Sequence, residues 1–371
     1  MAEVQKGAIE ALLLKLVRAG LSTEAQYVSV VGCVSASDWR ECYKLACAHG
    51  VMAIAWDGIS VLGLSPTLPR DLRLNWGLAV QRYEEKYHSY CSVATELSSF
   101  YRNHGIAMVQ MKGVGFSSYY PKPEHREGGD IDIYTFSADE SLMSNAEANS
   151  LADSLISESG IEVEYHCVKH SNFYYKGIPV ENHKTFLNTE SIALARPMND
   201  LLLELLSPRQ VCLNGGQNCI SVPSHKFNAL FLAFHAAQHF GSGLCLHHIV
   251  DWAILLKTQA VCMPEEVKDK KFLRFVNAIT SIAKEIVDID VATFEDSEYV
   301  LRVREQLFNP LYPHKQTPQV KTRFEIIVFK LKRLIYSQKL SNMVFDRSFL
   351  KRILDSAIAH LKSPETIFKL S

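Results

Sequence analysis

The sequence lacks an apolar run of the roughly 20 residues that a membrane-spanning helix requires. Its N-terminal segment follows an amphipathic pattern interrupted by Lys15 and Arg18, unlike the continuous apolar core of a secretion signal. Nine cysteines form no CxxC pair, and their odd number and scattered positions favour reduced thiols over a disulfide framework. From these absences we expect a cytoplasmic protein with no membrane span.

Net charge is also small, at -1 with neutral histidines, but the charges are unevenly distributed. Residues 315–371 contain 12 Lys or Arg against four Asp or Glu, so the rest of the chain is acidic. A basic segment of this kind can attract nucleic acid or another polyanion. The alternative is a solvated helix face, which we favour because aromatic side chains do not alternate regularly with the charges.

Hydrophobic residues make up 47% of the chain and charged residues 21%, the balance of a folded globular protein rather than a disordered one. At 371 residues, the chain is long enough for two or three domains. Apolar periodicity predicts helices over residues 5–19, 36–48 and 70–103. Either Ser35 or Ser37 would cap the second helix.

A different pattern follows the third helix. Residues 106–111 form a short apolar run near glycines, which predicts a strand. Ser137 and Glu140 match a capping box that would open a helix ending at Gly160. The remaining predictions are strands over 161–168 and 173–186, the second broken at 176–177, and a mostly helical region from 188 onward with a hairpin around 214–216.

Asp130 and Asp132 stand in the alternating segment Asp-Ile-Asp-Ile-Tyr. Side chains of an extended strand alternate between its faces, so these two carboxylates share one face. Ionised neighbours repel, and a hard divalent cation such as Mg²⁺ or Mn²⁺ relieves that repulsion. The pattern indicates a metal site for phosphoryl or nucleotidyl transfer. Its alternative is an edge strand with two solvated acids, and the upstream Lys-Gly turn argues against that alternative.

Lys112 and Gly113 form this turn, directly after the first predicted strand. Glycine lets backbone N–H groups approach a phosphate closely, and a short helix over residues 114–120 would present its N-terminus to the same anion. Ser117 is a candidate hydroxyl donor, although a serine in a turn more often bonds its own backbone. Lys112 could neutralise phosphate charge or could simply be solvated.

Two further groups have the spacing of a site. Glu162 and Glu164 share one face of a predicted strand, so they are alternatives for a third acid. His235 and His239 lie one helical turn apart, as zinc ligands can, but the segment lacks the glutamate of HExxH. Core or capping histidines are the favoured interpretation of that pair.

Four segments resemble a known family in their residues and their order. They are the Met-Lys-Gly turn at 111–113, the Tyr-Pro loop that carries Arg126, the Gly-Asp-Ile-Asp-Ile segment at 129–133, and the Glu-x-His of Glu181 and His183. The chain is similar to the uncharacterised nucleotidyltransferase family, a branch of the DNA polymerase β-like superfamily. The His-rich helical segment at 227–256 also resembles that family, so the likeness reaches about residue 260.

The resemblance implies a metal-dependent enzyme that moves a nucleoside monophosphate from an NTP to an acceptor and releases pyrophosphate. It assigns catalysis and the binding of Mg²⁺ or Mn²⁺ to three acids: Asp130, Asp132 and Glu181. It assigns nucleotide contacts to the turn and the loop: Lys112, Gly113, Ser117 and Arg126. The NTP donor is thus the expected partner, whereas the base, the oligomeric state and the acceptor, whether small molecule, protein or RNA, are left open.

We therefore expect an α+β fold, with a small mixed-sheet nucleotidyltransferase core flanked by N-terminal helices and a mostly α-helical C-terminal lobe. The expected boundaries are residues 1–104 for the N-terminal helical region, 105–187 for the core and 188–371 for the C-terminal helical domain. Two other functions compete with the transferase. One is a catalytically degenerate module that binds a nucleotide or a partner, and the other is a nucleic-acid-binding adaptor that uses the basic C-terminal lobe.

Overall fold

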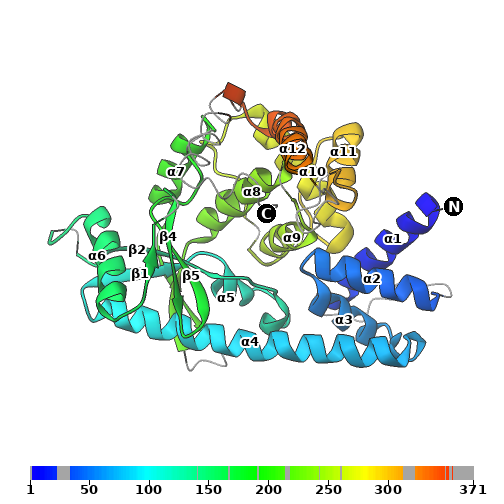
Figure 1. Cartoon of the computed structure of the whole chain (residues 1–371), viewed down its shortest axis with the longest axis horizontal. Coiled ribbons are helices and arrows are strands. Elements are labelled where there is room, and N and C mark those ends of the chain that lie inside the picture. The colour runs from blue at the N-terminus through cyan, green and yellow to red at the C-terminus, as the bar shows by residue number, and fades with distance from the viewer. Residues whose placement is uncertain are drawn as a thin grey trace.

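We describe a computed structural model of the chain, which is mixed α+β as the sequence predicts. The structure describes residues 2–22, 34–139, 141–165, 168–189, 192–213, 218–241, 243–259, 261–311, 322–346, 348–350 and 353. The long helix α4 runs along one side of the molecule. The sheet lies over one end of α4, the helices α1 to α3 lie at its other end, and the C-terminal helices lie above it (Figure 1).

The N-terminal helices are α1 (Ala2–Leu21), α2 (Ala36–Ala48), α3 (Met52–Val61) and α4 (Arg70–Arg102), with a 3₁₀ turn at Ser65–Thr67. Three of them match the predicted ranges closely. Ser35 caps α2, because its hydroxyl accepts from the amide of Asp38 and the Asp38 carboxylate accepts from the amide of Ser35. The sequence did not predict α3, since this helix is buried on nearly all sides and therefore has no polar face to create a period.

The main sheet has five strands in the order β1-β2-β5-β4-β3. Their bounds are β1 (Ile106–Gln110), β2 (Ile131–Ser137), β3 (Val163–Glu164), β4 (His170–Tyr175) and β5 (Ile178–His183). Strands β2 and β5 are parallel, whereas the other neighbours are antiparallel. The parallel pair aligns Asp132 with Glu181, so one strand register decides whether the predicted acids meet.

The helix after β2 begins later than the sequence predicts. Ser137 still belongs to β2, where it pairs with Ile106 of β1, and Glu140 lies outside the described residues. Helix α6 (Asn145–Glu158) begins after Ser144, which forms its own capping box with Glu147. The predicted box therefore failed because the strand pairing extends to its first residue. The strand predicted at 161–168 is also shorter, since β3 spans two residues.

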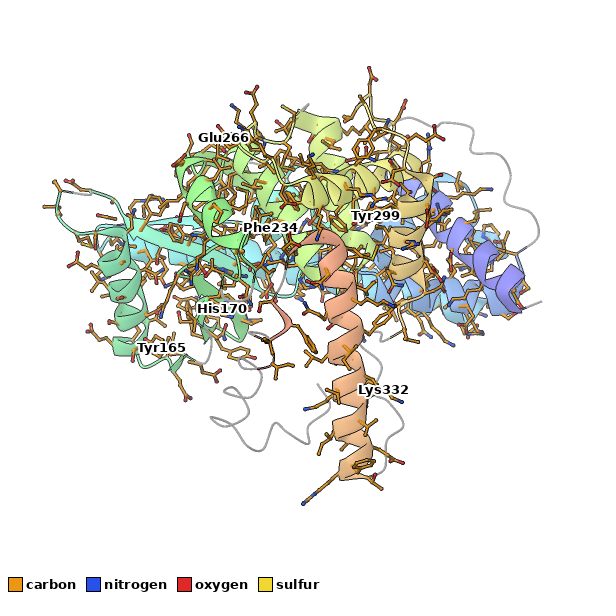
Figure 2. All side chains as sticks on the ribbon, turned by 90° about the horizontal axis from the view of Figure 1, so that it is seen from above. Tyr165, His170, Phe234, Glu266, Tyr299 and Lys332 are labelled. Atoms are coloured by element: carbon orange, nitrogen blue, oxygen red, sulfur yellow. A yellow bond between two sulfur atoms is a disulfide. The ribbon has the colours of Figure 1, made fainter. Side chains whose placement is uncertain are left out.

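The chain beyond residue 188 is mostly helical, as predicted. Its elements are α7 (Ala195–Glu204), β6 (Arg209–Leu213), β7 (Asn218–Val222), α8 (His225–Phe240), α9 (Leu246–Gln259), α10 (Lys270–Ile286), α11 (Ser297–Phe308) and α12 (Arg323–Val344). Strands β6 and β7 pair antiparallel, in agreement with the predicted hairpin, whose turn at 214–216 lies outside the described residues. Helix α12, which carries Lys332, projects from the body (Figure 2).

A disulfide bond joins Cys212 to Cys219, which face each other across β6 and β7. The expectation of reduced thiols throughout is therefore wrong for this pair. The hairpin brings the two residues together, and their sequence separation of 7 carries no recognised cysteine motif. Cytoplasmic localisation stays a prediction. Among the described helices, none combines the length with the hydrophobicity needed to cross a bilayer.

Two hydrophobic clusters hold the chain together. The first joins α1, α2, α3 and the start of α4 to the C-terminal helices, so the two ends of the sequence share a core. The second lies between the later part of α4, the sheet, α6 and the β6–β7 hairpin. The domain boundaries at residues 104 and 187 stay a prediction.

Helices α1 and α3 approach closely because each presents a glycine at their contact. A Cβ atom on Gly58 would lie 1.9 Å from the carbonyl oxygen of Leu16, and one on Gly20 would lie 2.1 Å from that of Ile54. We predict that Gly58→Ala lowers the free energy of unfolding by at least about 3 kcal/mol, because backbone must move to accept the methyl group. Urea denaturation followed by circular dichroism measures this change.

Gly7→Ala is the matched control in α1. A Cβ atom there has nothing within 4 Å, so alanine should leave stability unchanged or raise it by up to about 1 kcal/mol through helix propensity. Equal stability of Gly58→Ala and the wild type would contradict the close helix contact.

Candidate active site

Three carboxylates meet where β2 and β5 run side by side. Asp130 immediately precedes β2, Asp132 lies within it, and Glu181 is the partner of Asp132 in β5. One carboxylate oxygen from each residue lies within 4.8 Å of the other two. The predicted alternatives lie elsewhere, since Glu162 and Glu164 are exposed and Glu164 stands on the edge strand β3. The structure thus brings together the three acids that the sequence motif named.

Contacts with Lys112 and His183 offset the unfavourable burial of the Asp132 carboxylate. Its side chain is 3% exposed, Lys112 Nζ lies 3.2 Å from Oδ2, and His183 Nε2 lies 3.1 Å from Oδ1. Burial by itself raises the pKa of this carboxyl group, but Lys112 and His183 outweigh burial and hold the pKa below its usual value. Asp132 is therefore a stable anion at neutral pH.

Asp130 has the opposite electrostatic environment. Burial raises its pKa, and the negative charge of Asp132 raises it further. Lys112 opposes this shift without cancelling it. Two carboxylates that differ in this way share one site, and a cation placed between them would favour ionisation of both.

Glu181 is held by two histidines of adjacent strands. Its Oε2 atom lies 3.2 Å from His170 Nδ1 and 3.4 Å from His183 Nε2. His170, labelled in Figure 2, stands opposite His183 in the pairing of β4 with β5. The sequence motif included His183, but His170 was missed because strand pairing, rather than sequence proximity, places it there.

A buried polar network lies on the opposite face of β2 and β5 from the acids. Asn182 lies between Glu181 and His183 in sequence, so its side chain points to the opposite face of β5. Its Oδ1 atom accepts hydrogen bonds from Thr135 at 2.9 Å and from Asn149 at 3.1 Å, and its Nδ2 atom donates to Asp153 at 2.9 Å. The network therefore links β2, β5 and α6 and fixes the register that aligns Asp132 with Glu181.

Gly113 occupies a backbone conformation that suits only glycine well. Its φ angle is +60°, and a Cβ atom would lie 2.9 Å from Gln110 Nε2. The turn places Lys112 against Asp132, while the amide of Met111 donates to the carbonyl oxygen of Asp132 at 3.0 Å. The short helix α5 (Gly113–Ser117) follows directly.

Two of the expected nucleotide contacts are engaged with protein groups instead. Ser117 is buried, and its hydroxyl donates to the carbonyl oxygen of Val114 at 2.7 Å. Arg126 forms a bidentate ion pair with Asp251, in which Nε donates to Oδ1 at 2.9 Å and Nη2 donates to Oδ2 at 2.7 Å. Both arrangements follow from burial, since a buried polar group requires a hydrogen-bond partner. Asp251 lies far from Arg126 in the sequence, so local patterns could not reveal this pair.

The loop between Gly113 and Asp130 is fixed at many points. Its short 3₁₀ turn spans Pro123–His125. Four of its side chains bond to groups in helices: Lys122 and His125 to Asp57, His125 also to Glu84, Arg126 to Asp251, and the Glu127 carboxylate to the first amides of α3. Two side chains of α4 donate to its backbone, Lys86 to the carbonyl oxygen of Gly128 and Tyr90 to that of Gly129. Helices α3, α4 and α9 thus hold the segment that delivers Asp130.

Two cavities lie away from the carboxylates. One of ≈ 20 Å³ beside Gly113, Arg126 and Gly128 has room for about one water molecule. Another of ≈ 660 Å³ is an open pocket lined by α9, α10 and residues 261–263 and 288–294. None of the three acids lines either cavity. The acid cluster is therefore identified by its chemistry and geometry.

The chain matches a known protein family over more than half of its length. A model of the family described as "Uncharacterised nucleotidyltransferase" matches residues 35–288. No curated protein matches the sequence. The chain is similar to a solved structure, the "Crystal structure of an antigenic nucleotidyltransferase-like protein from Paracoccidioides brasiliensis", with a TM-score of 0.37 and 16% identity over 56% of this chain and 96% of that chain. The family match includes the acid cluster and helices α8 and α9.

The Arg126–Asp251 pair gives a first prediction for this region. Both side chains are nearly buried, at 8% and 6% exposed, so Asp251→Asn would leave the guanidinium without its counter-charge. We expect a loss of about 3–5 kcal/mol in the free energy of unfolding, measured by urea denaturation. The exposed pair Arg302–Glu298 is the control, and Glu298→Gln should cost less than about 1 kcal/mol. Equal effects of the two substitutions would contradict the structural role of Asp251.

His125 makes part of the stability depend on pH. Burial lowers its pKa, but its bonds to Asp57 and Glu84 outweigh burial and raise it above the ordinary value. A raised pKa in the folded state stabilises the protein fully below the unfolded pKa of about 6.5, and this contribution is lost as pH rises through the folded value.

We therefore predict that wild type loses its stability advantage over His125→Gln as pH increases above about 6.5. Urea midpoints of both proteins at several pH values between about 6 and 9 measure the difference. Subtracting the variant removes the contribution of other titrating groups. An advantage that grows with pH would contradict the assignment of a protonated His125.

Proposed function

Because the chain belongs to the uncharacterised nucleotidyltransferase family, we propose that it transfers a nucleoside monophosphate from an NTP to an acceptor, with a divalent metal and release of pyrophosphate. One observation supports this most directly. Asp130, Asp132 and Glu181 converge where the start of β2 lies beside the second half of the parallel strand β5, with one oxygen of each within 4.8 Å of the others.

The donor set fits a hard divalent cation. Mg²⁺ and Mn²⁺ prefer oxygen ligands, and three carboxylates supply them at close range. Burial and then the negative charge of Asp132 raise the pKa of Asp130, so a nearby cation would favour its ionised form. In this proposal Asp130, Asp132 and Glu181 hold the metal, which when bound would neutralise phosphate charge and activate the acceptor hydroxyl.

The surrounding residues position these groups. His170 and His183 lie beside the carboxylate of Glu181, which in this proposal accepts a proton from an acceptor hydroxyl. Lys112 stands beside Asp132 and supplies positive charge near an incoming phosphate. Gly113 lets the backbone approach the nucleotide without a side chain between them. No covalent protein nucleophile is needed, because positioning and charge stabilisation carry most of such a transfer.

The substitutions Asp130→Asn and Asp132→Asn test this proposal. The protein is incubated with each α-labelled NTP, Mg²⁺ or Mn²⁺, and cell extract as the source of acceptor. We expect labelled product with wild type and a loss of at least about 100-fold in its rate of formation with either variant, since each removes a metal ligand. Glu164→Gln, an acid of the same sheet outside the cluster, should retain the wild-type rate.

The other outcomes identify the competing functions. Metal-dependent NTP binding with no labelled product from any extract would favour the degenerate binding module. Steeply salt-dependent binding of RNA or DNA that survives both substitutions, again without transfer, would favour the nucleic-acid adaptor. Unchanged transfer in Asp130→Asn and Asp132→Asn would refute the carboxylate mechanism itself.

A further inference from the structure

We propose that His235, His239 and His248 form a second metal site, which binds one transition-metal ion such as Zn²⁺ separately from the carboxylate site. Every ligand in this group is an imidazole. Imidazole nitrogen suits Zn²⁺, whereas Mg²⁺ requires oxygen ligands, so the two sites would select different metals. The proposal does not depend on the transferase activity.

The three rings converge on a small region. One ring nitrogen of each histidine lies within 4.8 Å of those of the other two. The ring centres are 4.5 Å apart for His235 and His239, 4.7 Å for His239 and His248, and 5.3 Å for His235 and His248. Rings that merely packed together would not need their nitrogens to converge. A metal with Zn–N distances of about 2.0–2.1 Å could be reached by all three after small side-chain rotations.

Two helices supply these ligands. His235 and His239 are four residues apart in α8, so both project from one face of that helix. His248 projects from α9, which packs beside α8 (Figure 1). The sequence indicated the first pair and discounted it for want of the HExxH glutamate. The third histidine comes from the next helix, so a single-helix motif could not have revealed it.

The backbone holds the ring of His248. Its Nδ1 atom lies 3.0 Å from the amide nitrogen of Cys245 and 3.2 Å from the carbonyl oxygen of the same residue. The amide of Cys245 donates to Nδ1, so Nε2 carries the proton in this hydrogen-bonded state. A metal at Nε2 would require the other tautomer, in which Nδ1–H donates to the carbonyl oxygen of Cys245. Metal-binding histidines are commonly oriented by such a bond from their other nitrogen.

The charge state of the histidines also suits a metal. Burial lowers the pKa of His235 and of His248 well below the ordinary value, so both imidazoles are neutral at pH 7. The positive charge of Lys112 lowers the pKa of both rings further. Neutral imidazole is the form that coordinates a metal, so the charge of these rings need not change before the ion binds.

Three histidine ligands leave one coordination position of a tetrahedral ion open. Sites of this composition can hold a water molecule or a ligand at the fourth position, unlike closed structural sites with four protein ligands. The proposed ion could thus bind one further ligand besides the three imidazoles.

Zinc titration of the full-length, chelator-treated protein tests the proposal, with a chromophoric chelator as competitor. We expect one strongly bound equivalent in wild type. His235→Ala and His239→Ala should each weaken it by at least about 100-fold, because ligand loss exceeds the effect of outer-shell changes. Binding of Co²⁺ should give the visible absorption of a tetrahedral site in wild type and lose it in both variants.

Two controls separate this site from its surroundings. Glu181→Gln removes the residue shared by the acid cluster and by the neighbouring group His170–Glu181–His183, so it should leave the strong zinc equivalent intact. His225→Ala removes a histidine of the same helix outside the cluster and should also leave it intact. Circular dichroism of the metal-free proteins checks folding, and His239→Gln replaces His239→Ala if the alanine variant does not fold.

The results can overturn the proposal clearly. It fails if folded cluster variants bind zinc as tightly as wild type, or if wild type binds no equivalent more tightly than the variants do. It also fails if Glu181→Gln abolishes the strong equivalent, since the ion would then belong to the strands. Loss of transferase activity in Asp130→Asn with zinc binding retained would support two separate sites.

Discussion

The charge of Asp132 is the constraint on which the site depends. Its carboxylate is almost fully buried beside two other acids, which would be unfavourable without a close ion pair and a close hydrogen-bond partner. Lys112 provides one partner through the Gly113 turn, and His183 provides the other through the pairing of β2 with β5. The turn, the parallel strands and the network around Asn182 can therefore be understood as one arrangement that holds an anion in place.

A second set of charges serves the loop that precedes Asp130. Long loops are usually mobile, yet this one contains a buried pair of Arg126 with Asp251 and a buried contact of His125 with Asp57. These contacts join the loop to α9 and α3, elements far from it in sequence. Because α9 also carries His248, the same helix that anchors the loop contributes to the histidine cluster. Helix α9 therefore contributes both to the loop that precedes the acid site and to the histidine cluster.

Local signals explain what the sequence could predict. Periodicity located α4, alternation placed Asp130 and Asp132 on one face of β2, and the family resemblance added Glu181, which the structure brings beside them. His170 and the Asp251 partner of Arg126 were missed because they belong to segments that meet only in the fold. The Cys212–Cys219 bond was missed because it depends on the strand register of the β6–β7 hairpin. Helix α3 was not predicted for a different reason: it is buried on nearly every side, so its apolar residues do not recur with a helical period.

The charges in the acid cluster bear on how a metal would enter it. Three carboxylates lie together here, and Lys112 is the ammonium group that pairs with Asp132, so full ionisation would gather more negative charge than this lysine neutralises. Asp130, whose pKa is raised by burial and by the charge of Asp132, is the acid whose ionisation a divalent cation would favour most. A bound cation would also share the neutralisation of Asp132, so the ammonium group of Lys112 would be able to interact with a phosphate. In the proposed transferase, metal entry and readiness for the nucleotide would thus be coupled through a single lysine.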